Sequence, residues 1–268
     1  MHKLKKSLGQ NLLIDKNIIN KIISLEDLKN RNILEVGGGT GNLTGPIINK
    51  NIKNLVIIEK DDNFCKLLRE KFINQKNIKI YNQDILKYNL NNTGLSNAII
   101  FGNLPYNIST QILINFIKVK DWPPFYKKII FMFQKEVADR ILAKYDSKQF
   151  GRLAIITNFR LEIVESFKIS KNCFYPKPDV DSKIIVFKPR SKIKYEISDI
   201  QNLEKITNTF FTNRRKMINK PFAKIFKDYK IVAKKLKINL NARPSELSFQ
   251  DYFKLTEYFE KTKKKHCS

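Results

Sequence analysis

The sequence predicts an α/β protein whose mostly parallel sheet has helices on both faces and is followed by a small all-α C-terminal domain. Two observations lead to this fold class. Short apolar runs alternate with segments of helical periodicity through the first 190 residues, which is typical of parallel βαβ units. Beyond Pro189 the pattern is helical to the end of the chain. We therefore expect two domains, 1–190 and 191–268, in a chain long enough to bury one large core and a smaller one.

The individual elements follow from the length and period of each segment. Five apolar runs of strand length are expected to form the parallel strands: 32–36, 55–59, 78–84, 98–104 and 129–133. Segments 61–72 and 110–119 between them have helical spacing. Runs 161–169 and 181–189 are strand-like with little room for a helix between them, so we expect an antiparallel pair that closes the sheet. Helices are expected at 199–218, 227–238 and 248–261, and a disordered tail at 261–268.

Charge is the strongest signal in the composition. The chain holds 51 Lys and Arg against 25 Asp and Glu, a formal net charge of +26. This excess favours a polyanionic partner, nucleic acid before an anionic membrane, although a compositional bias toward lysine is the alternative explanation. From Ser191 onward the net charge is +11 in 78 residues, against +15 in the first 190. The charge density nearly doubles in the predicted helical domain, which we therefore expect to contact the nucleic acid.

Several classes of protein are disfavoured by what the sequence lacks. No apolar run is long enough to cross a bilayer and the first ten residues contain no signal-peptide segment, so we expect a cytoplasmic protein without a membrane partner. Cys65, Cys173 and Cys267 are scattered, and the two histidines, His2 and His266, lie near the ends. We therefore expect no disulfide framework, no metal site and no histidine-based catalytic triad.

Glycines and acids follow three successive strand ends, where parallel sheets bind their ligands. Gly37, Gly39 and Gly41 in "EVGGGTGNLT" allow a tight turn and close approach of a ligand, although a plain strand-to-helix turn needs only one of them. Glu59 ends the second strand, where its carboxylate can accept hydrogen bonds from the hydroxyls of a ribose. An ordinary surface glutamate is the alternative interpretation. Asp84 ends the third, placed to meet an adenine amino group. Together these features predict an adenosine-bearing cofactor.

The fourth strand ends in "FGNLPYNIST", which places Asn103, Leu104, Pro105 and Tyr106 at the same edge of the sheet. Proline disfavours helical geometry at Leu104, so a following helix does not use the Leu104 carbonyl. That carbonyl and the Asn103 side-chain oxygen are two acceptors that suit an exocyclic NH2, and the Tyr106 ring suits a nucleobase taken out of its stack. A capped strand end with a packed tyrosine is the alternative interpretation.

These blocks together resemble the ribosomal RNA adenine dimethyltransferase family. The segments "KKSLGQNLL", "EVGGGTGNLT", "IEKD", "NQDIL", "FGNLPYNIST", "FQKEVADR", "CFYPKPDVDSKII" and "NRRK" have its order and spacing, from Lys5 to about Phe253. "GNLPYNIS" and "ARPSELS" are most similar to its small-subunit rRNA branch. Gly38 departs from the usual proline, which we expect to loosen the loop, and Leu12 departs from the usual phenylalanine. The resemblance implies a Rossmann-like class I methyltransferase domain with a seven-stranded sheet.

The resemblance also implies roles for single residues. The implied contacts to S-adenosylmethionine are Asn11, Leu13, Gly37, Glu59, Asp84 and Asn103. Tyr106 is implied to stack on the target adenine, and Phe174, in a loop bounded by Pro176 and Pro178, to help hold it. Arg214, Arg215 and Lys216 in "NRRK" are expected to track RNA phosphates, unless they are a solvated helix face.

The implied activity is methyl transfer to N6 of two adjacent adenines in a hairpin loop near the 3′ end of small-subunit rRNA. The product is N6,N6-dimethyladenosine, the substrate is a pre-ribosomal particle, and the reaction is coupled to small-subunit biogenesis; a monomer is the default expectation. A large-subunit enzyme of the macrolide-resistance type and a non-catalytic RNA-binding assembly factor remain alternatives. Intact Asn103, Tyr106, Glu59 and the glycine loop favour catalysis, and "GNLPYNIS" and "ARPSELS" favour the small subunit.

Overall fold

A computed structural model describes residues 11–265 of the chain, which divide into two compact units. One unit takes the chain up to Ala138 together with Glu162–Pro189. The other takes Asp139–Leu161 together with the chain from Arg190 onward. The predicted domain boundary, between residues 190 and 191, lies one residue from the point where the chain last passes from the first unit to the second. Residues 139–161, which the prediction placed in the first domain, belong to the second unit.

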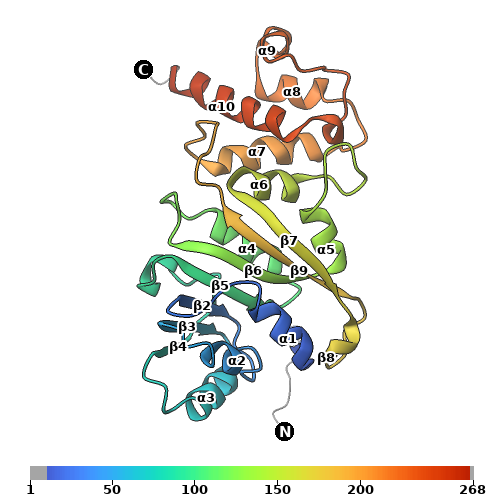
Figure 1. Cartoon of the computed structure of the whole chain (residues 1–268). Helices are drawn as coiled ribbons and strands as arrows, with labels where there is room; N and C mark the ends of the chain where they lie inside the picture. The colour runs from blue at the N-terminus through green and yellow to red at the C-terminus, as the bar shows by residue number, and fades with distance from the viewer. Residues whose placement is uncertain (1–10, 266–268) are drawn as a thin grey trace. The chain divides into compact units, whose positions relative to one another are not determined.

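A seven-stranded sheet with the order β4-β3-β2-β5-β6-β9-β7 forms the body of the first unit (Figure 1). Its strands are β2 (Asn32–Val36), β3 (Asn54–Glu59), β4 (Ile78–Asn82), β5 (Ala98–Asn103), β6 (Tyr126–Gln134), β7 (Leu161–Ile169) and β9 (Ser182–Pro189). The pairs β2–β3, β2–β5, β3–β4 and β5–β6 are parallel, and β9 is antiparallel to β6. The predicted mostly parallel seven-stranded sheet is confirmed.

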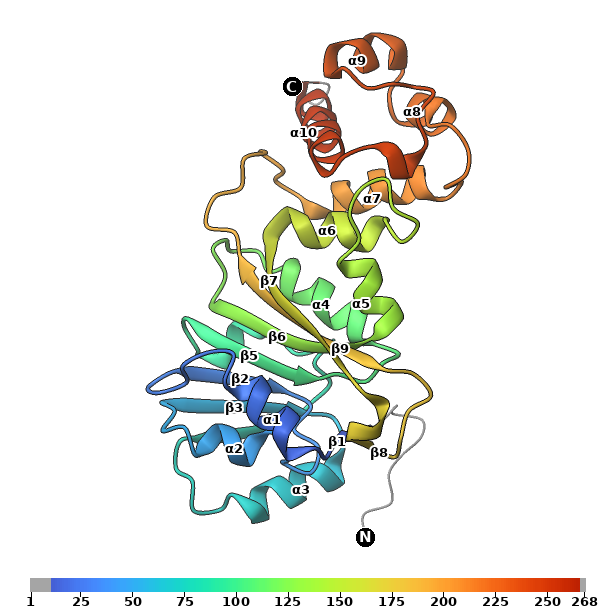
Figure 2. The same ribbon diagram turned by 45° about the vertical axis from the view of Figure 1, so that its right-hand side comes forward.

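Helices cover both faces of this sheet, which explains why its central strands read as unbroken apolar runs. Figures 1 and 2 show α1 (Lys16–Ile23) in front of the sheet and α4 (Ser109–Ile117) behind it. This unit also contains α2 (Thr44–Ile48) and α3 (Asp62–Lys71), with 3₁₀ turns at Leu90–Thr93 and Lys171–Cys173, and the chain leaves it within α5 (Lys135–Ile141). Asp15 caps α1 by accepting from the backbone N–H groups of Asn17 and Ile18.

A second, two-stranded sheet joins the beginning of the described chain to a distant segment. Strand β1 (Leu12–Leu13) pairs antiparallel with β8 (Phe174–Tyr175), so that Leu12 lies opposite Tyr175 and Leu13 opposite Phe174. Neither strand was predicted, because two residues are too few to show an alternating pattern.

The second unit is helical. Its helices are α6 (Arg152–Arg160), α7 (Ile200–Phe211), α8 (Asn219–Ile225), α9 (Tyr229–Leu236) and α10 (Phe249–Lys265), with a 3₁₀ turn at Pro244–Glu246. They pack around the fully buried rings of Phe210, Phe222 and Tyr252, and the Tyr252 hydroxyl donates to the Pro244 carbonyl over 2.7 Å. Burying large aromatic rings stabilises such a small core.

Two helix ends differ from the predictions. Helix α7 ends at Phe211 and not at Ile218, and the polar segment that follows forms a turn. Helix α10 continues to Lys265, so the predicted disordered tail is wrong for 261–265, while 266–268 lie outside the described residues. Between residues 11 and 265 no helix combines the length and apolar character needed to span a bilayer.

Candidate active site

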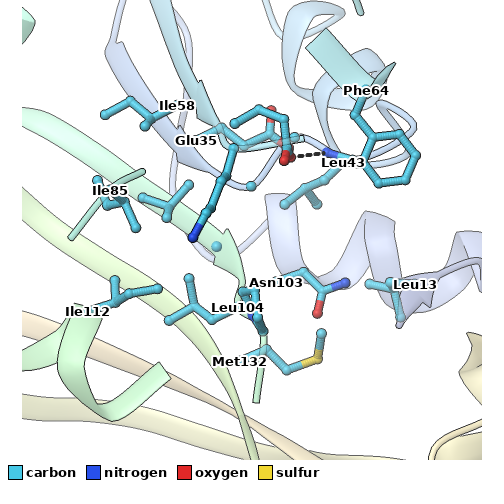
Figure 3. Close-up of a pocket in the computed structure, with 18 of the residues that line it drawn as sticks. Leu13, Glu35, Leu43, Ile58, Phe64, Ile85, Asn103, Leu104, Ile112 and Met132 are labelled. Atoms are coloured by element: carbon cyan, nitrogen blue, oxygen red, sulfur yellow. Dashed lines mark hydrogen bonds between the residues drawn. The ribbon is translucent and has the colours of Figure 1, made fainter. Parts of the chain in front are cut away.

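The strand order reverses beside β2, because the chain runs from β2 to β3 and β4 on one side and returns to β5 on the other. Open parallel sheets bind ligands at the carboxyl ends of the strands at such a point. A cavity of about 220 Å³ lies there, and Figure 3 shows apolar side chains around it, among them Ile58, Phe64, Ile85 and Ile112.

The cavity gathers most of the predicted site residues but not all of them. Those that line it are Asn11, Leu13, Gly37, Gly39, Glu59, Asp84, Asn103, Leu104 and Pro105. Gly41, Tyr106 and Phe174 do not line it. Leu12, Glu35 and Asn42 also line it, although the sequence analysis gave them no binding role.

The glycine loop after β2 brings its backbone close to the N-terminal segment. Gly37, Gly39 and Gly41 have φ angles of +78°, +52° and +80°, which lie in the left-handed region that glycine adopts without strain. A Cβ on Gly39 would also lie 3.2 Å from Cδ2 of Leu12. Any larger residue at Gly39 would therefore push against the segment that covers the loop.

Gly38 is packed against two buried side chains. A Cβ at this position would lie 2.8 Å from Cγ2 of Ile57 and 2.9 Å from Cδ1 of Leu68, both fully buried. These side chains occupy the space that a larger residue would need. The looser loop expected from Gly38 stays a prediction, and this packing opposes it.

Glu59 ends β3 with each carboxylate oxygen already hydrogen-bonded to the backbone. Oε1 accepts from the Asp61 N–H over 2.8 Å and Oε2 from the Gly39 N–H over 3.0 Å. The residue is 8% exposed, and burial raises the pKa of its carboxyl although these donors oppose the rise. Each oxygen keeps a lone pair for a bound hydroxyl. Glu59 is therefore held beside the glycine loop in a position where it can accept from a ribose.

A second carboxyl group, that of Glu35 in β2, lies in the same cavity. It is 1% exposed and accepts a hydrogen bond from the Thr44 hydroxyl over 2.7 Å. Burial raises the pKa of Glu35 to about 8, and the charge of Glu59 adds to the rise. Glu35 is therefore largely protonated at neutral pH and brings little negative charge to the cavity. The only sequence signal for it was its place just before the glycine loop.

Asp84 lies two residues beyond the end of β4 and forms an ion pair at the cavity wall. Its Oδ2 is 2.9 Å from Nζ of Lys60, and its Oδ1 accepts from the Leu86 N–H over 3.0 Å. Burial alone would raise the pKa of Asp84, but the hydrogen bond from Lys60 holds it below the ordinary value. Asp84 therefore stays ionised, and both of its oxygens can only accept. Within the described residues no three His, Cys, Asp or Glu side chains gather as metal ligands would.

Asn103, the last residue of β5, has a fixed amide orientation. Its Nδ2 donates to the Asn11 carbonyl over 2.8 Å. A carbonyl can only accept, so the amide nitrogen must face Asn11 and Oδ1 must point elsewhere; Figure 3 shows the nitrogen and the oxygen of Asn103 pointing in different directions. Oδ1 accepts no hydrogen bond from the residues that the structure describes, and the Leu104 carbonyl accepts none from the backbone of residues 11–265. Two neighbouring acceptors are thus available at this strand end.

Tyr106 follows these acceptors and is half-buried. Its hydroxyl lies 2.8 Å from Oγ of Ser182, the first residue of β9, and Ser182 is fully buried. Burial raises the pKa of Tyr106 while the hydrogen bond with Ser182 opposes the rise. The tyrosine is therefore protonated and anchored through its hydroxyl. The role predicted from sequence involved only its ring.

Phe174 is a core residue in this structure. It is 3% exposed and belongs to the cluster that contains Leu13, Met132 and Ile184. These three neighbours all line the cavity, so Phe174 supports the cavity wall from behind. Its predicted contact with a target base stays a prediction, and in this conformation the ring is covered.

The segment predicted to close over the cofactor is held at both ends of β1. The Asn103 amide donates to the Asn11 carbonyl, and the Asn42 amide, in the glycine loop, donates to the Leu13 carbonyl over 2.9 Å. The segment therefore rests on the glycine loop and on the end of β5. Asn42 was missed because its bond joins residues far apart in sequence.

The predicted RNA-contacting residues of the second unit lie in the turn between α7 and α8 and not on a helix face. Arg215 and Lys216 are exposed. Arg214 is partly buried, and its Nη2 donates to the Ser147 carbonyl over 3.1 Å within the same unit. Arg214 thus has a structural contact, whereas the other two cations face solvent.

Comparisons with known proteins find relatives over nearly the whole chain. The family model described as "Ribosomal RNA adenine dimethylase" matches residues 1–261. The protein named ribosomal RNA small subunit methyltransferase A from Pelagibacter ubique is 44% identical over 258 residues, covering 96% of this chain and 97% of the relative. The protein of the same name from Francisella tularensis subsp. novicida is 36% identical over 263 residues, covering 96% and 97%.

Two solved structures share the fold. A dimethyladenosine transferase from Plasmodium falciparum superposes with a TM-score of 0.75 at 24% identity, over 94% of this chain and 98% of that one. The 23S rRNA methyltransferase ErmE gives a TM-score of 0.67 at 22% identity, over 93% and 99%.

Proposed function

Since the chain belongs to the ribosomal RNA adenine dimethylase family, we propose that it transfers methyl groups from S-adenosylmethionine to N6 of adenines in small-subunit ribosomal RNA. The targets are two adjacent adenines in the hairpin loop near the 3′ end. The observation that carries the proposal is the pair of available acceptors, Asn103 Oδ1 and the Leu104 carbonyl, beside a cavity at the sheet's switch point.

The cavity suits S-adenosylmethionine. Glu59 keeps lone pairs for the ribose hydroxyls, and ionised Asp84 is an acceptor for the adenine amine. Leu12 lies so close to Gly39 that only glycine fits there, and the backbone of the loop is left open to close approach by the cofactor. Because Glu35 is protonated, it does not add a buried negative charge to that of Glu59 when the cofactor binds. When bound, the cofactor supplies a methyl group on a positively charged sulfur.

The chain's own residues then act on the target amine. Asn103 Oδ1 and the Leu104 carbonyl accept from the two N6–H donors, which favours a pyramidal nitrogen and stabilises the positive charge that develops on it. Because Asn11 fixes the Asn103 amide, this acceptor needs no reorientation during the reaction. No strong base is needed, since the N6 proton becomes acidic only as the new bond forms. After one methylation a hydrogen remains on nitrogen, so a second transfer is chemically open.

The Tyr106 ring provides the stacking surface for the target base, and its orientation is set by Ser182. The exposed cations Arg215 and Lys216 of the second unit bind phosphates of the same RNA. We place the reaction on a pre-ribosomal particle in the cytoplasm, with the protein acting as a monomer and its reaction coupled to small-subunit biogenesis.

One experiment tests this function against its alternatives. The protein is incubated with labelled S-adenosylmethionine and undermethylated small or large ribosomal subunits, and the modified nucleosides are mapped. We expect dimethyladenosine in the small subunit only, and its formation should be about 100-fold slower or more with Asn103→Ala. Label confined to the large subunit would identify a resistance-type enzyme. Particle binding without label would identify an assembly factor.

A further inference from the structure

The pairing of β1 with β8 separates two neighbouring aromatic rings. Residues directly opposite each other in an antiparallel pair project to the same face, and successive residues project to opposite faces. Leu13 and Phe174 therefore share one face, while Leu12 and Tyr175 share the other. Leu13 and Phe174 are 5% and 3% exposed, so their face is the core face. Tyr175, which is 59% exposed, projects away from the core.

Leu12 shows where this outer face lies. Leu12 lines the cavity and would be 3.2 Å from a Cβ on Gly39, so it covers the glycine loop. Tyr175 lies opposite Leu12 but does not line the cavity. The Tyr175 side chain therefore stands outside the cavity and next to a residue of its wall.

A second exposed apolar side chain continues the same surface. Ile14 is 50% exposed and follows Leu12 by two residues, and its N–H donates to the Cys173 carbonyl over 2.9 Å, which extends the pairing. Ile14 therefore projects to the side of Leu12 and Tyr175. Lys16 and Lys177, each two residues along the chain from Ile14 and Tyr175, are also exposed.

The loop that carries Tyr175 also reaches the target-base site. It runs from β8 to Ser182, whose hydroxyl is hydrogen-bonded to Tyr106. Tyr175 and the residue that anchors Tyr106 are thus the two ends of one short loop. An RNA strand that delivers a base to Tyr106 would place its next nucleotides beside this loop.

We propose that Tyr175 and Ile14 form a stacking platform for an unpaired base of the substrate RNA, the neighbour of the adenine that enters the site. An exposed aromatic ring flanked by cations is how proteins bind single-stranded nucleic acid, with the ring against a base and the cations near phosphates. The ligand is a nucleobase of a loop. The platform rests on the proposed function, because it requires an RNA substrate with unpaired bases. Phe174 keeps its place in the core.

The kinetic test compares Tyr175→Ala and Tyr175→Phe with the wild type on undermethylated small subunits. Removing one base–aromatic stack weakens binding by about 5- to 150-fold, so we expect KM for the particle to rise by that factor in Tyr175→Ala while kcat changes little. Tyr175→Phe keeps the ring and should restore the wild-type KM. The affinity for S-adenosylmethionine, measured by calorimetry, should be unchanged in both variants.

Tyr145→Ala is the matched control, because Tyr145 is an exposed tyrosine of similar exposure, 57%, in the second unit. We expect its KM to stay at the wild-type value. An unchanged KM in Tyr175→Ala, or an equal rise in Tyr145→Ala, overturns the platform. A loss of cofactor affinity in Tyr175→Ala also overturns it, since that result would assign the side chain to holding β1 in place.

A direct probe separates the platform from the proposed activity. Tyr175→Trp places an indole on the surface, and a synthetic hairpin RNA with two adjacent unpaired adenines should quench its fluorescence saturably, whereas Tyr145→Trp should show no quenching. Absence of quenching in Tyr175→Trp when the RNA is bound overturns the platform. Failure of the wild type to methylate any ribosomal RNA would overturn the proposed function instead, and the quenching would still report on the platform.

Discussion

Removing the Tyr106 hydroxyl tests whether the target-base ring is anchored or only packed. Tyr106→Phe keeps the ring and deletes one atom, the oxygen 2.8 Å from Oγ of Ser182. From sequence alone we expect this variant to keep most of its activity, because the ring does the stacking. The structure adds that the ring is held by a hydrogen bond to a fully buried serine. The size of that bond decides how much activity the variant loses.

A hydrogen bond between neutral groups contributes about 0.5 to 1.5 kcal/mol net, so loss of the anchor should slow methyl transfer by about 2- to 10-fold. Tyr106→Ala also loses base stacking, a further 1 to 3 kcal/mol or so, and should be slower than Tyr106→Phe by about 5- to 150-fold. The unpaired Ser182 hydroxyl left in Tyr106→Phe adds a stability cost of about 1 to 3 kcal/mol.

The assay is single-turnover methylation of undermethylated small subunits by five proteins: wild type, Tyr106→Phe, Tyr106→Ala, Ser182→Ala and the double variant that combines Tyr106→Phe with Ser182→Ala. Tyr106→Phe and Ser182→Ala remove the same bond, so the double variant should be about as slow as either of them. Losses that multiply in the double variant would show that the two hydroxyls act separately. Equal losses in Tyr106→Phe and Tyr106→Ala would refute stacking by the ring.

Four further outcomes follow from the site. Asn103→Ala should lower turnover by about 100-fold or more with little change in RNA affinity, and a near-normal rate would mean that the chemistry lies elsewhere. Glu59→Ala should weaken S-adenosylmethionine binding by about 1 to 3 kcal/mol in a calorimetric titration; unchanged affinity would remove Glu59 from the site. Burial raises the pKa of Glu35 to about 8, so from about pH 4.5 to 8 the folded chain keeps a proton that the unfolded chain releases, and stability falls as pH rises, by up to about 1.4 kcal/mol per pH unit. Urea unfolding at pH 5 and 7.5 measures this fall in the free energy of unfolding, and Glu35→Gln should remove it. An equal fall in Glu35→Gln would show that Glu35 does not hold a proton in the folded state. Neutralising Arg215 and Lys216 together should reduce the slope of log affinity for the particle against log salt by about two, and an unchanged slope would contradict their contact with phosphates.

The parallel core was predictable because its signals are local. Strands β2, β3 and β5 are buried on both faces, and each is a short apolar run that ends in glycine or a polar residue. The position of the cavity followed from the same strand ends, since parallel strands bring their carboxyl ends to one edge. Helix α6 was not predicted, because it is buried nearly all round and so lacks an amphipathic period.

The missed features depend on contacts between distant parts of the chain. The pairing of β1 with β8 joins residues about 160 positions apart through two-residue strands, too short for any periodic pattern. Its register decides which of two adjacent rings, Phe174 or Tyr175, faces the core, and a shift by one residue would exchange them. The sequence predicts that the aromatic pair Phe174 and Tyr175 lies near the site, but it does not show which of the two rings is exposed.

Strand β1 connects the three parts of the site that must act together. The carbonyl of Asn11, just before β1, accepts from the Asn103 amide, the carbonyl of Leu13 accepts from the Asn42 amide, and β1 pairs with β8, where the aromatic loop begins. Displacing β1 breaks all three connections at once. The Asn103 amide would then be free to rotate. The segment that covers the glycine loop is therefore also the segment that fixes the Asn103 amide, so we expect any movement of β1 over the cavity to change the orientation of Asn103 Oδ1 as well.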